Sequence, residues 1–152
     1  MPEAKKGLVT SFFTTTQPRQ SDDNNYNGKG VRIRYFGHAC MLVQTQSISI
    51  LFDPVISYPI DSNIPRYTFD DLPDQIDFVV ITHNHQDHLM FETLLQLRHK
   101  IRHIVFPANQ KGALADPSIK LILEHVGFSS LIELSDMQTL TIEDGEIIAL
   151  PF

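Results

Sequence analysis

The stretch that decides the fold is residues 77–88, which read Asp-Phe-Val-Val-Ile-Thr-His-Asn-His-Gln-Asp-His. Its first half, residues 77–82, is a nearly continuous apolar run, as in a strand buried on both faces of a sheet. Its second half places three histidines and one aspartate within six residues. Loops at the carboxyl ends of such strands are where layered α/β proteins place their functional sites. The stretch therefore predicts a central strand that delivers a cluster of polar side chains.

The side chains of this cluster have the chemistry of a metal site. His83, His85, Asp87 and His88 offer imidazole nitrogens and a carboxylate, a set that suits zinc, iron or manganese. A simpler interpretation is a polar turn in which one of these side chains caps the following helix. A cap needs only one such residue, so the four together favour metal binding.

The residues that follow predict two helices. The first has Leu89, Leu94, Leu95 and Leu97 on one face. The second runs from Pro117 to about His125 and is ended by Gly127. Further strands are expected at residues 31–35, 41–45, 47–52, 103–106, 130–134, 139–142 and 147–150. Strands that alternate with helices after an antiparallel start indicate an α/β layered domain.

The N-terminal part is predicted to be an arm over residues 1–30, partly disordered, because residues 17–30 are polar and rich in turn formers. A short apolar piece at residues 8–13 is a candidate edge strand. In residues 31–35 three apolar side chains alternate with arginines, which is the pattern of a half-buried strand with its apolar side toward the core. Ordered structure is therefore expected to begin at residue 31.

A long irregular loop is expected at residues 55–75, which hold three prolines among aspartates and aromatic residues. Long loops in compact domains are more often functional than accidental. Tyr58, Arg66 and Tyr67 could contact a ligand there, or they could pack the loop onto the domain.

The composition excludes several classes of protein. A net charge of −6 with no cluster of basic residues argues against a nucleic-acid partner. No apolar run approaches the roughly 20 residues of a membrane helix, so no membrane partner is expected. The lone cysteine, Cys40, excludes an intrachain disulfide and fits a reducing, cytoplasmic location. We expect Cys40 to be a small core residue. We expect the protein to act on a small-molecule substrate.

The motif resembles the His-x-His-x-Asp-His signature of the metallo-β-lactamase-fold superfamily. This resemblance implies a partial αββα sandwich over residues 31–152, the N-terminal half of that fold, and two zinc ions, with iron or manganese as other possibilities. His83 and His85 would bind the first ion, and Asp87 and His88 the second. Two adjacent metals can share one hydroxide. Asp87 would also act in catalysis by orienting or deprotonating that nucleophile.

Two further elements resemble the lactonase-like branch of the superfamily. Phe36-Gly37-His38-Ala39-Cys40 is similar to its Gly-His-Ala element, which implies that His38 is a catalytic group that contacts substrate or an oxyanion. On spacing alone His38 could equally be an ordinary histidine. Leu51-Phe52-Asp53-Pro54 is similar to its Leu-x-Asp-Pro element, which implies that Asp53 fixes either the motif loop or a ligand histidine. A common Asp-Pro turn is the alternative.

The resemblance implies later metal ligands that this sequence lacks, because no histidine follows His125. We therefore expect a fragment or truncated product that is inactive alone, whose parent is a metal-dependent hydrolase of ester, lactone, amide or phosphodiester bonds. A dinuclear iron oxygenase of the same fold is the second hypothesis, since histidine and carboxylate accept both metals. An inactive truncated paralogue or binding module is the third.

Overall fold

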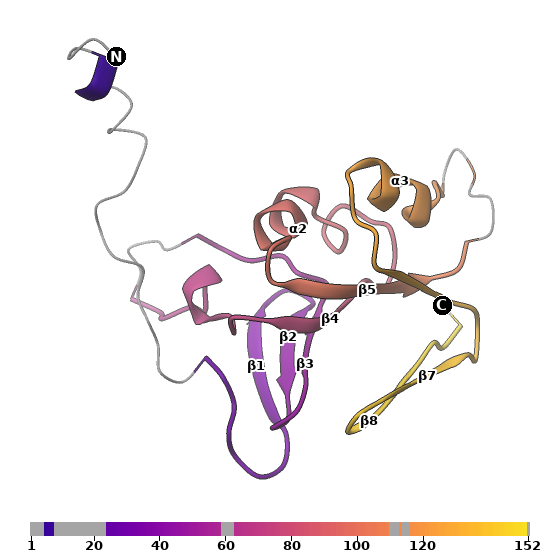
Figure 1. Ribbon diagram of the computed structural model, residues 1–152, viewed down its shortest axis with the longest axis horizontal. Coiled ribbons are helices and arrows are strands. Elements are labelled where there is room, and N and C mark those ends of the chain that lie inside the picture. The colour runs from indigo at the N-terminus through magenta and orange to yellow at the C-terminus, as the bar shows by residue number, and fades with distance from the viewer. Residues whose placement is uncertain (1–4, 8–23, 59–62, 110–112, 114–115, 152) are drawn as a thin grey trace.

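The computed structural model describes residues 5–7, 24–58, 63–109, 113 and 116–151. Within them, six strands form one sheet in chain order (Figure 1). The strands are β1 (Arg32–Gly37), β2 (Cys40–Gln44), β3 (Ser49–Phe52), β4 (Ile76–Val80), β5 (Ile101–Pro107) and β6 (Leu131–Leu134). The edge strand expected at residues 8–13 and most of the N-terminal arm lie outside the described residues.

The sheet changes from antiparallel to parallel at β3. Strands β1, β2 and β3 pair antiparallel, and β2 and β3 form a hairpin. Strands β3 to β6 pair in parallel, and parallel neighbours need a connection that crosses the sheet. The helices α2 (Phe91–Leu97) and α3 (Ile119–His125) lie in the last two of these connections. The predicted α/β class is confirmed.

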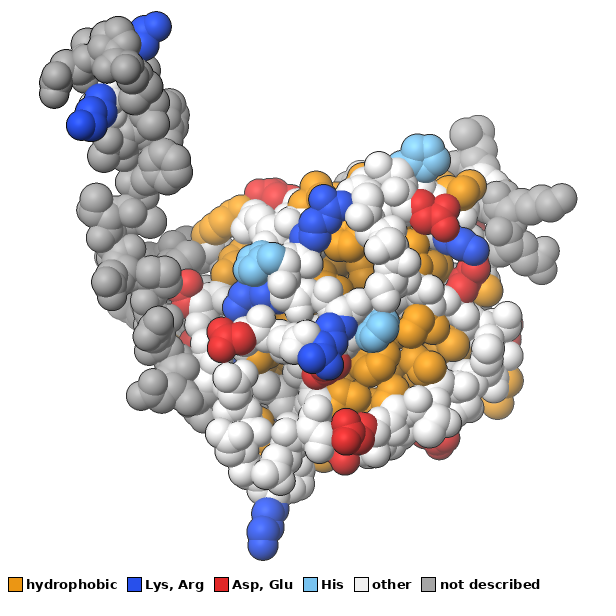
Figure 2. Space-filling view, in the orientation of Figure 1, with side chains coloured by type: hydrophobic (Ala, Val, Ile, Leu, Met, Phe, Trp, Pro, Cys, Tyr) orange, Lys and Arg blue, Asp and Glu red, His pale blue; other side chains and the backbone are white. Residues whose placement is uncertain are grey.

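The sheet separates two apolar layers because its side chains alternate in direction. In β3, Leu51 joins the larger core cluster, which includes buried residues of both helices. Its neighbour Ile50 faces the other way and packs in a layer with the hairpin of β7 (Thr139–Ile142) and β8 (Gly145–Ile148). Figure 1 shows the helices and this hairpin on opposite sides of the sheet, and Figure 2 shows orange apolar side chains on the viewed face between charged ones. No helix among the described residues is long and apolar enough to cross a membrane.

The prediction for the first strand was right about its alternation and wrong about its direction. Val31, Ile33 and Tyr35 are each more than 60 % exposed, whereas the side chain of Arg34 is buried. These apolar residues lie on the sheet face that β7 and β8 cover, but the cluster of described residues on that face includes none from β1. A period of two fixes which residues share a face, and it does not say which face is covered.

Arg34 is buried because polar groups and a ring surround its guanidinium. Its Nη2 donates to the backbone carbonyl of Asn24 (3.2 Å) and to Oε1 of Gln44 (3.1 Å). The guanidinium carbon lies 5.5 Å from the ring centroid of Tyr67. A buried arginine is tolerated when its charge is hydrogen-bonded, so this residue joins the end of the N-terminal arm to the sheet.

The helices follow the sequence prediction with small corrections. In α2, Leu94 and Leu97 are buried as expected, but Leu95 is 45 % exposed. Each residue of an α-helix turns by about 100°, so Leu95 points away from the face shared by its neighbours. In α3, Ser118 caps the first turn and Gly127 has a positive φ of 88° just beyond the end, so the helix begins two residues after Pro117.

The C-terminal strands and the long loop were predicted to within a few residues. Strand β8 begins two residues before the expected segment at 147–150, while β7 matches its expected segment. Among its described residues, the loop between β3 and β4 contains a 3-10 turn, η1 (Phe69–Asp71). The hydroxyl of Tyr58 donates to Glu92 of α2 at 2.7 Å, and Tyr67 stacks near Phe36 at 5.2 Å. Both tyrosines therefore pack the loop onto the domain.

Cys40 is a core residue, as expected, and its reactivity should follow from its burial. The side chain is fully buried, and desolvation by this burial raises the pKa of the thiol to about 12. The reactive thiolate at pH 8 is then roughly 10⁻⁴ of the total. We expect almost no reaction with a thiol reagent in native buffer and complete reaction in denaturant. Stoichiometric modification of the folded protein within minutes would contradict this packing.

Candidate metal centre

Three connections meet at one edge of the sheet and carry the candidate ligands. The motif lies between β4 and α2, Asp53 directly follows β3, and His38 lies in the turn between β1 and β2. Strands β1, β3 and β4 run in the same direction, because β2 is antiparallel to both of its neighbours. Their carboxyl ends therefore lie at a common edge. The structure brings together residues that are up to 50 positions apart in the sequence.

Asp53 is the most buried polar group of this edge, at 2 % exposure. Its Oδ1 accepts the backbone N–H of Thr82 at 2.8 Å, and its Oδ2 accepts the hydroxyl of Thr82 at 2.7 Å. The same Oδ2 lies 2.9 Å from Nδ1 of His88. The backbone N–H of Asp53 donates to Val80 and continues the pairing of β3 with β4. These three contacts give both oxygens of the carboxylate a hydrogen-bond partner, so it can be buried at this position.

The contact with Asp53 determines which nitrogen of His88 can bind a metal. A carboxylate only accepts hydrogen bonds, so Nδ1 of His88 must carry the proton in this contact. In the neutral ring the other nitrogen, Nε2, is then the one whose lone pair is available to a metal, and it lies 3.9 Å from Oδ2 of Asp87. Carboxylate–histidine pairs of this kind set the tautomer of metal ligands and raise their basicity.

His83 and His85 form a second pair of donors. Nε2 of His83 lies 3.1 Å from Nδ1 of His85, and the two rings meet edge to face at 4.5 Å between centroids. Desolvation by burial is the main cause that lowers the pKa of His83, followed by the charges of His88 and His85. A lowered pKa favours neutral imidazole, which is the form that binds metal ions.

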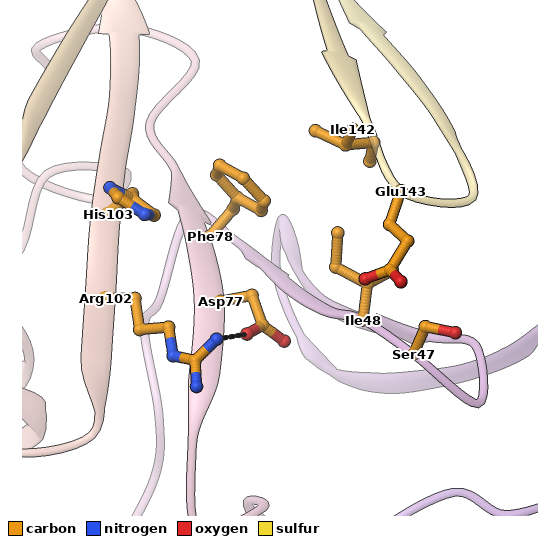
Figure 3. Close-up of a pocket in the computed structure, with 8 residues that line it drawn as sticks. All are labelled: Ser47, Ile48, Asp77, Phe78, Arg102, His103, Ile142 and Glu143. Atoms are coloured by element: carbon orange, nitrogen blue, oxygen red, sulfur yellow. Dashed lines mark ion pairs between the residues drawn. The ribbon is translucent and has the colours of Figure 1, made fainter.

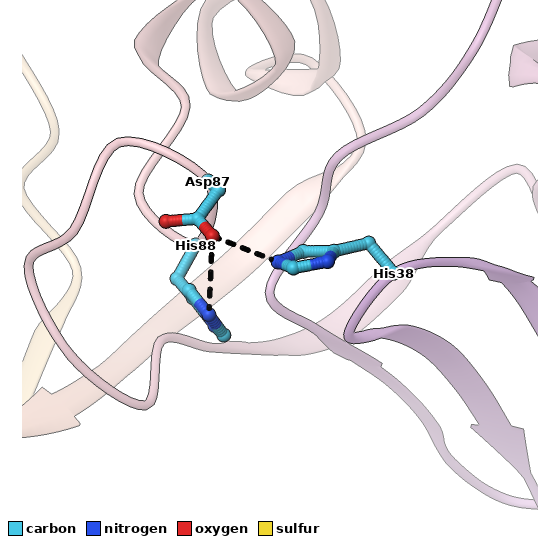
Figure 4. Close-up of side chains that lie close together, drawn as sticks. All are labelled: His38, Asp87 and His88. Atoms are coloured by element: carbon cyan, nitrogen blue, oxygen red, sulfur yellow. Dashed lines mark ion pairs between the residues drawn. The ribbon is translucent and has the colours of Figure 1, made fainter.

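His38 and Asp87 face each other across the edge. Figure 4 shows the imidazole of His38 pointing toward the carboxylate of Asp87, with His88 below it. Nε2 of His38 lies 3.1 Å from Oδ2 of Asp87. A hydrogen bond from its own backbone N–H is the first cause that lowers the pKa of Asp87, and the charges of His88 and His38 also contribute. Asp87 is therefore held in its ionised, metal-binding form.

The donor set fits a metal ion on its chemistry and its spacing. His38, Asp87 and His88 each offer a ligand atom, and these atoms lie within 4.8 Å of one another. His83 and His85 place two more imidazoles beside them, since the rings of His83 and His88 are 3.9 Å apart. Imidazole with carboxylate accommodates zinc, iron and manganese alike.

Thr82 and Asn84 lie on either side of His83, where the sequence predicts residues that support the ligands or form the turn. The hydroxyl of Thr82 lies 2.7 Å from Asp53 and 3.0 Å from Nδ1 of His83, so it links the two pairs of donors. The side chain of Asn84 donates to Asp116 at 2.5 Å and fixes the motif loop to the segment before α3. The sequence places Thr82 directly before the first histidine, but its contact with Asp53 could be identified only from the folded structure.

The histidines outside the motif take no part in this edge, apart from His38. His103 lies in β5, at the strand expected over residues 103–106, where it stacks on Phe78 at 5.3 Å and contacts Ser130 at 2.7 Å. It lines a hollow of about 210 Å³ at the opposite edge of the sheet (Figure 3). Two of the charged residues that line this hollow, Arg102 and Asp77, form an ion pair with each other at 3.2 Å. The hollow lies beside the β7–β8 hairpin, whose Ile142 and Glu143 line it.

The comparisons with known proteins agree with this geometry. A family profile described as "Beta-lactamase superfamily domain" matches residues 32–148. The chain is 42 % identical over 125 residues to the 4-amino-L-phenylalanyl-(CmlP-peptidyl-carrier-protein) 3-hydroxylase of Streptomyces venezuelae, covering 79 % of this chain and 23 % of the hydroxylase. A UPF0173 metal-dependent hydrolase of Pyrobaculum neutrophilum is 37 % identical over 59 residues, covering 39 % of this chain and 25 % of the hydrolase.

A solved structure supports the same assignment. The crystal structure of CmlA, a diiron β-hydroxylase from Streptomyces venezuelae, matches with a TM-score of 0.80 at 35 % identity, covering 100 % of this chain and 27 % of that one. The matched part of the chain spans about a quarter of the length of each of these relatives. The expected partial αββα sandwich is confirmed. Since the profile also covers most of the sequence, the chain belongs to the metallo-β-lactamase superfamily.

Proposed function

We propose that this chain contributes to the metal centre of a hydroxylase that oxidises an amino acid held on a peptidyl carrier protein, with iron as the metal. One observation carries this proposal: the chain is 42 % identical to a hydroxylase with that substrate over 79 % of its length. Its similarity to the named hydrolase extends over 39 %. Imidazole and carboxylate donors suit zinc and iron alike, so similarity across the rest of the chain weighs more than the motif.

In this proposal the motif residues hold two ions, and the carboxylate of Asp53 orients one of these ligands, His88. His83 and His85 bind one ion, and Asp87 and His88 bind the other. Asp53 keeps the proton of His88 on Nδ1, so that Nε2 faces the ion. When bound, two irons would supply oxygen-activating redox chemistry, whereas two zincs would supply Lewis-acid activation of water.

We also propose that residues 31–152 form the first part of a longer metallo-β-lactamase domain. Residues 32–148 match the family profile, and the hydroxylase is about four times as long as this chain. A metal position needs about three protein ligands, and His83 and His85 supply two. Further ligands would come from segments outside this chain.

The metal-dependent hydrolase that the sequence first favoured is the second candidate. The similarity to a metal-dependent hydrolase supports it, and so does a donor set that accepts zinc. A protein without catalytic activity is the third candidate, and it predicts that added metal fails to raise thermal stability.

The full-length protein tests these candidates through its metal and its oxygen consumption. We expect close to two equivalents of iron after expression in unsupplemented medium. We also expect oxygen consumption with an aminoacylated carrier protein, and none with the free amino acid. Two equivalents of zinc together with cleavage of an ester or lactone would select the hydrolase instead.

Asp53→Asn tests the orienting carboxylate. A carboxylate accepts all three hydrogen bonds at Asp53, but a carboxamide has one accepting oxygen and one donating nitrogen. In either orientation the substituted carboxamide would face Thr82 or His88 donor to donor. We expect the affinity for the metal to fall roughly 10- to 100-fold, measured by calorimetric titration of metal-free protein.

The matched control for this substitution is Asp74→Asn. Asp74 is an exposed aspartate in the loop that precedes β4, so its substitution removes the same charge away from the metal centre. It should leave the affinity unchanged. Equal affinities of the Asp53 and Asp74 variants would show that Asp53 does not orient a ligand.

A further inference from the structure

The turn that carries His38 has a backbone conformation that few side chains adopt. Gly37 pairs with Cys40, so His38 and Ala39 form a two-residue connection between β1 and β2. His38 has a φ of 51°, in the left-handed region where such turns usually hold glycine or asparagine. The pairing of the strands is also irregular between Tyr35 and Gly37, and irregularities of this kind redirect side chains.

Packing does not explain this conformation. The side chain of His38 is about half exposed, at 49 %, so the strained backbone buries little apolar surface. Its ring contacts Asp87, at 3.1 Å, and the ring of His88, at 5.0 Å between centroids. Strain that packing does not offset is found mostly at functional sites. The turn therefore serves to aim His38 at these two residues.

We propose that His38 is itself a metal ligand and completes the position of Asp87 and His88. The three donors would be Nε2 of His38, Oδ2 of Asp87 and Nε2 of His88. This inference rests on the metal centre of the proposed function, and it assigns His38 to the ion, where the family resemblance assigned it to the substrate.

The observed spacing is close to what one ion requires. Tetrahedral bonds of 2.0–2.2 Å place donor atoms roughly 3.3–3.6 Å apart. Oδ2 of Asp87 lies 3.1 Å from His38 and 3.9 Å from His88, so its two distances bracket this value. His38 is half exposed and can turn by the small amount that coordination needs. The orientation of His88 is already set by Asp53.

The two metal positions of the chain are then unequal. Asp87 and His88 gain a third protein ligand and keep an open position, whereas His83 and His85 offer two donors from the described residues. Three ligands with one open position is the arrangement of a catalytic ion. One ion should therefore bind more tightly than the other, and its affinity should depend on a residue that lies outside the motif.

Substitution of His38 by asparagine separates ligation from a role in folding. Asparagine tolerates a positive φ, so the turn should form without strain, but its amide is a poor metal ligand. We expect His38→Asn in the full-length protein to weaken the tighter zinc site by at least roughly 10-fold, since even the loss of an outer partner has that effect. The melting temperature of the metal-free protein should not fall. His99→Asn, at an exposed histidine, is the matched control and should bind zinc like wild type.

X-ray absorption of the protein with one equivalent of cobalt counts the histidine ligands. We expect one fewer histidine in the His38 variant than in wild type. Weaker binding with an unchanged count would mean that His38 acts through its hydrogen bond to Asp87, and would overturn ligation. Unchanged affinity and count would also overturn it and leave the proposed function standing. A wild-type protein that binds no metal would remove both.

Discussion

The buried carboxylate of Asp53 is the constraint on which this edge of the structure depends. It accepts hydrogen bonds from the backbone and hydroxyl of Thr82, and it contacts Nδ1 of His88. A buried charge must be paired or hydrogen-bonded, so the residues after β3 and β4 cannot separate without a large cost in free energy. The parallel pairing of β3 and β4 is what brings these residues together.

The remaining candidate ligands are arranged around this contact. The hydroxyl of Thr82 contacts both Asp53 and His83. The carboxylate of Asp87 lies beside His88 on one side and His38 on the other. Asp53 and His38 are two of the three described residues other than glycine with a positive φ. Strain at two contact points of one site indicates that its geometry is held by the surrounding sheet.

Much of this arrangement could be predicted from the sequence, because the signals are local. The run at 77–88 combines an apolar strand with contiguous ligand residues, so it indicated both the buried strand and the metal motif. The burial of Arg34 could not be predicted, because it depends on the carbonyl of Asn24, ten residues away. The contact between His38 and Asp87 could not be predicted either, because it requires the strand order of the sheet.

The motif residues do not distinguish a hydrolase from a hydroxylase. Neutral imidazole and carboxylate bind zinc and iron with similar geometry, so the four motif residues carry no information about the reaction. Similarity across 79 % of the chain is what favours the hydroxylase. The geometry of the edge is common to both proposals, because each needs His88 to present Nε2 to an ion.

Nitrogen NMR of the histidine rings in the isotope-labelled, metal-free protein tests this account most directly. The account predicts that the neutral ring of His88 carries its proton on Nδ1, held in this one tautomer by Asp53. In Asp53→Asn the two tautomers should both be populated. A wild-type His88 that is protonated on Nε2, or that averages between tautomers, would contradict the claim that Asp53 prepares this ligand for a metal.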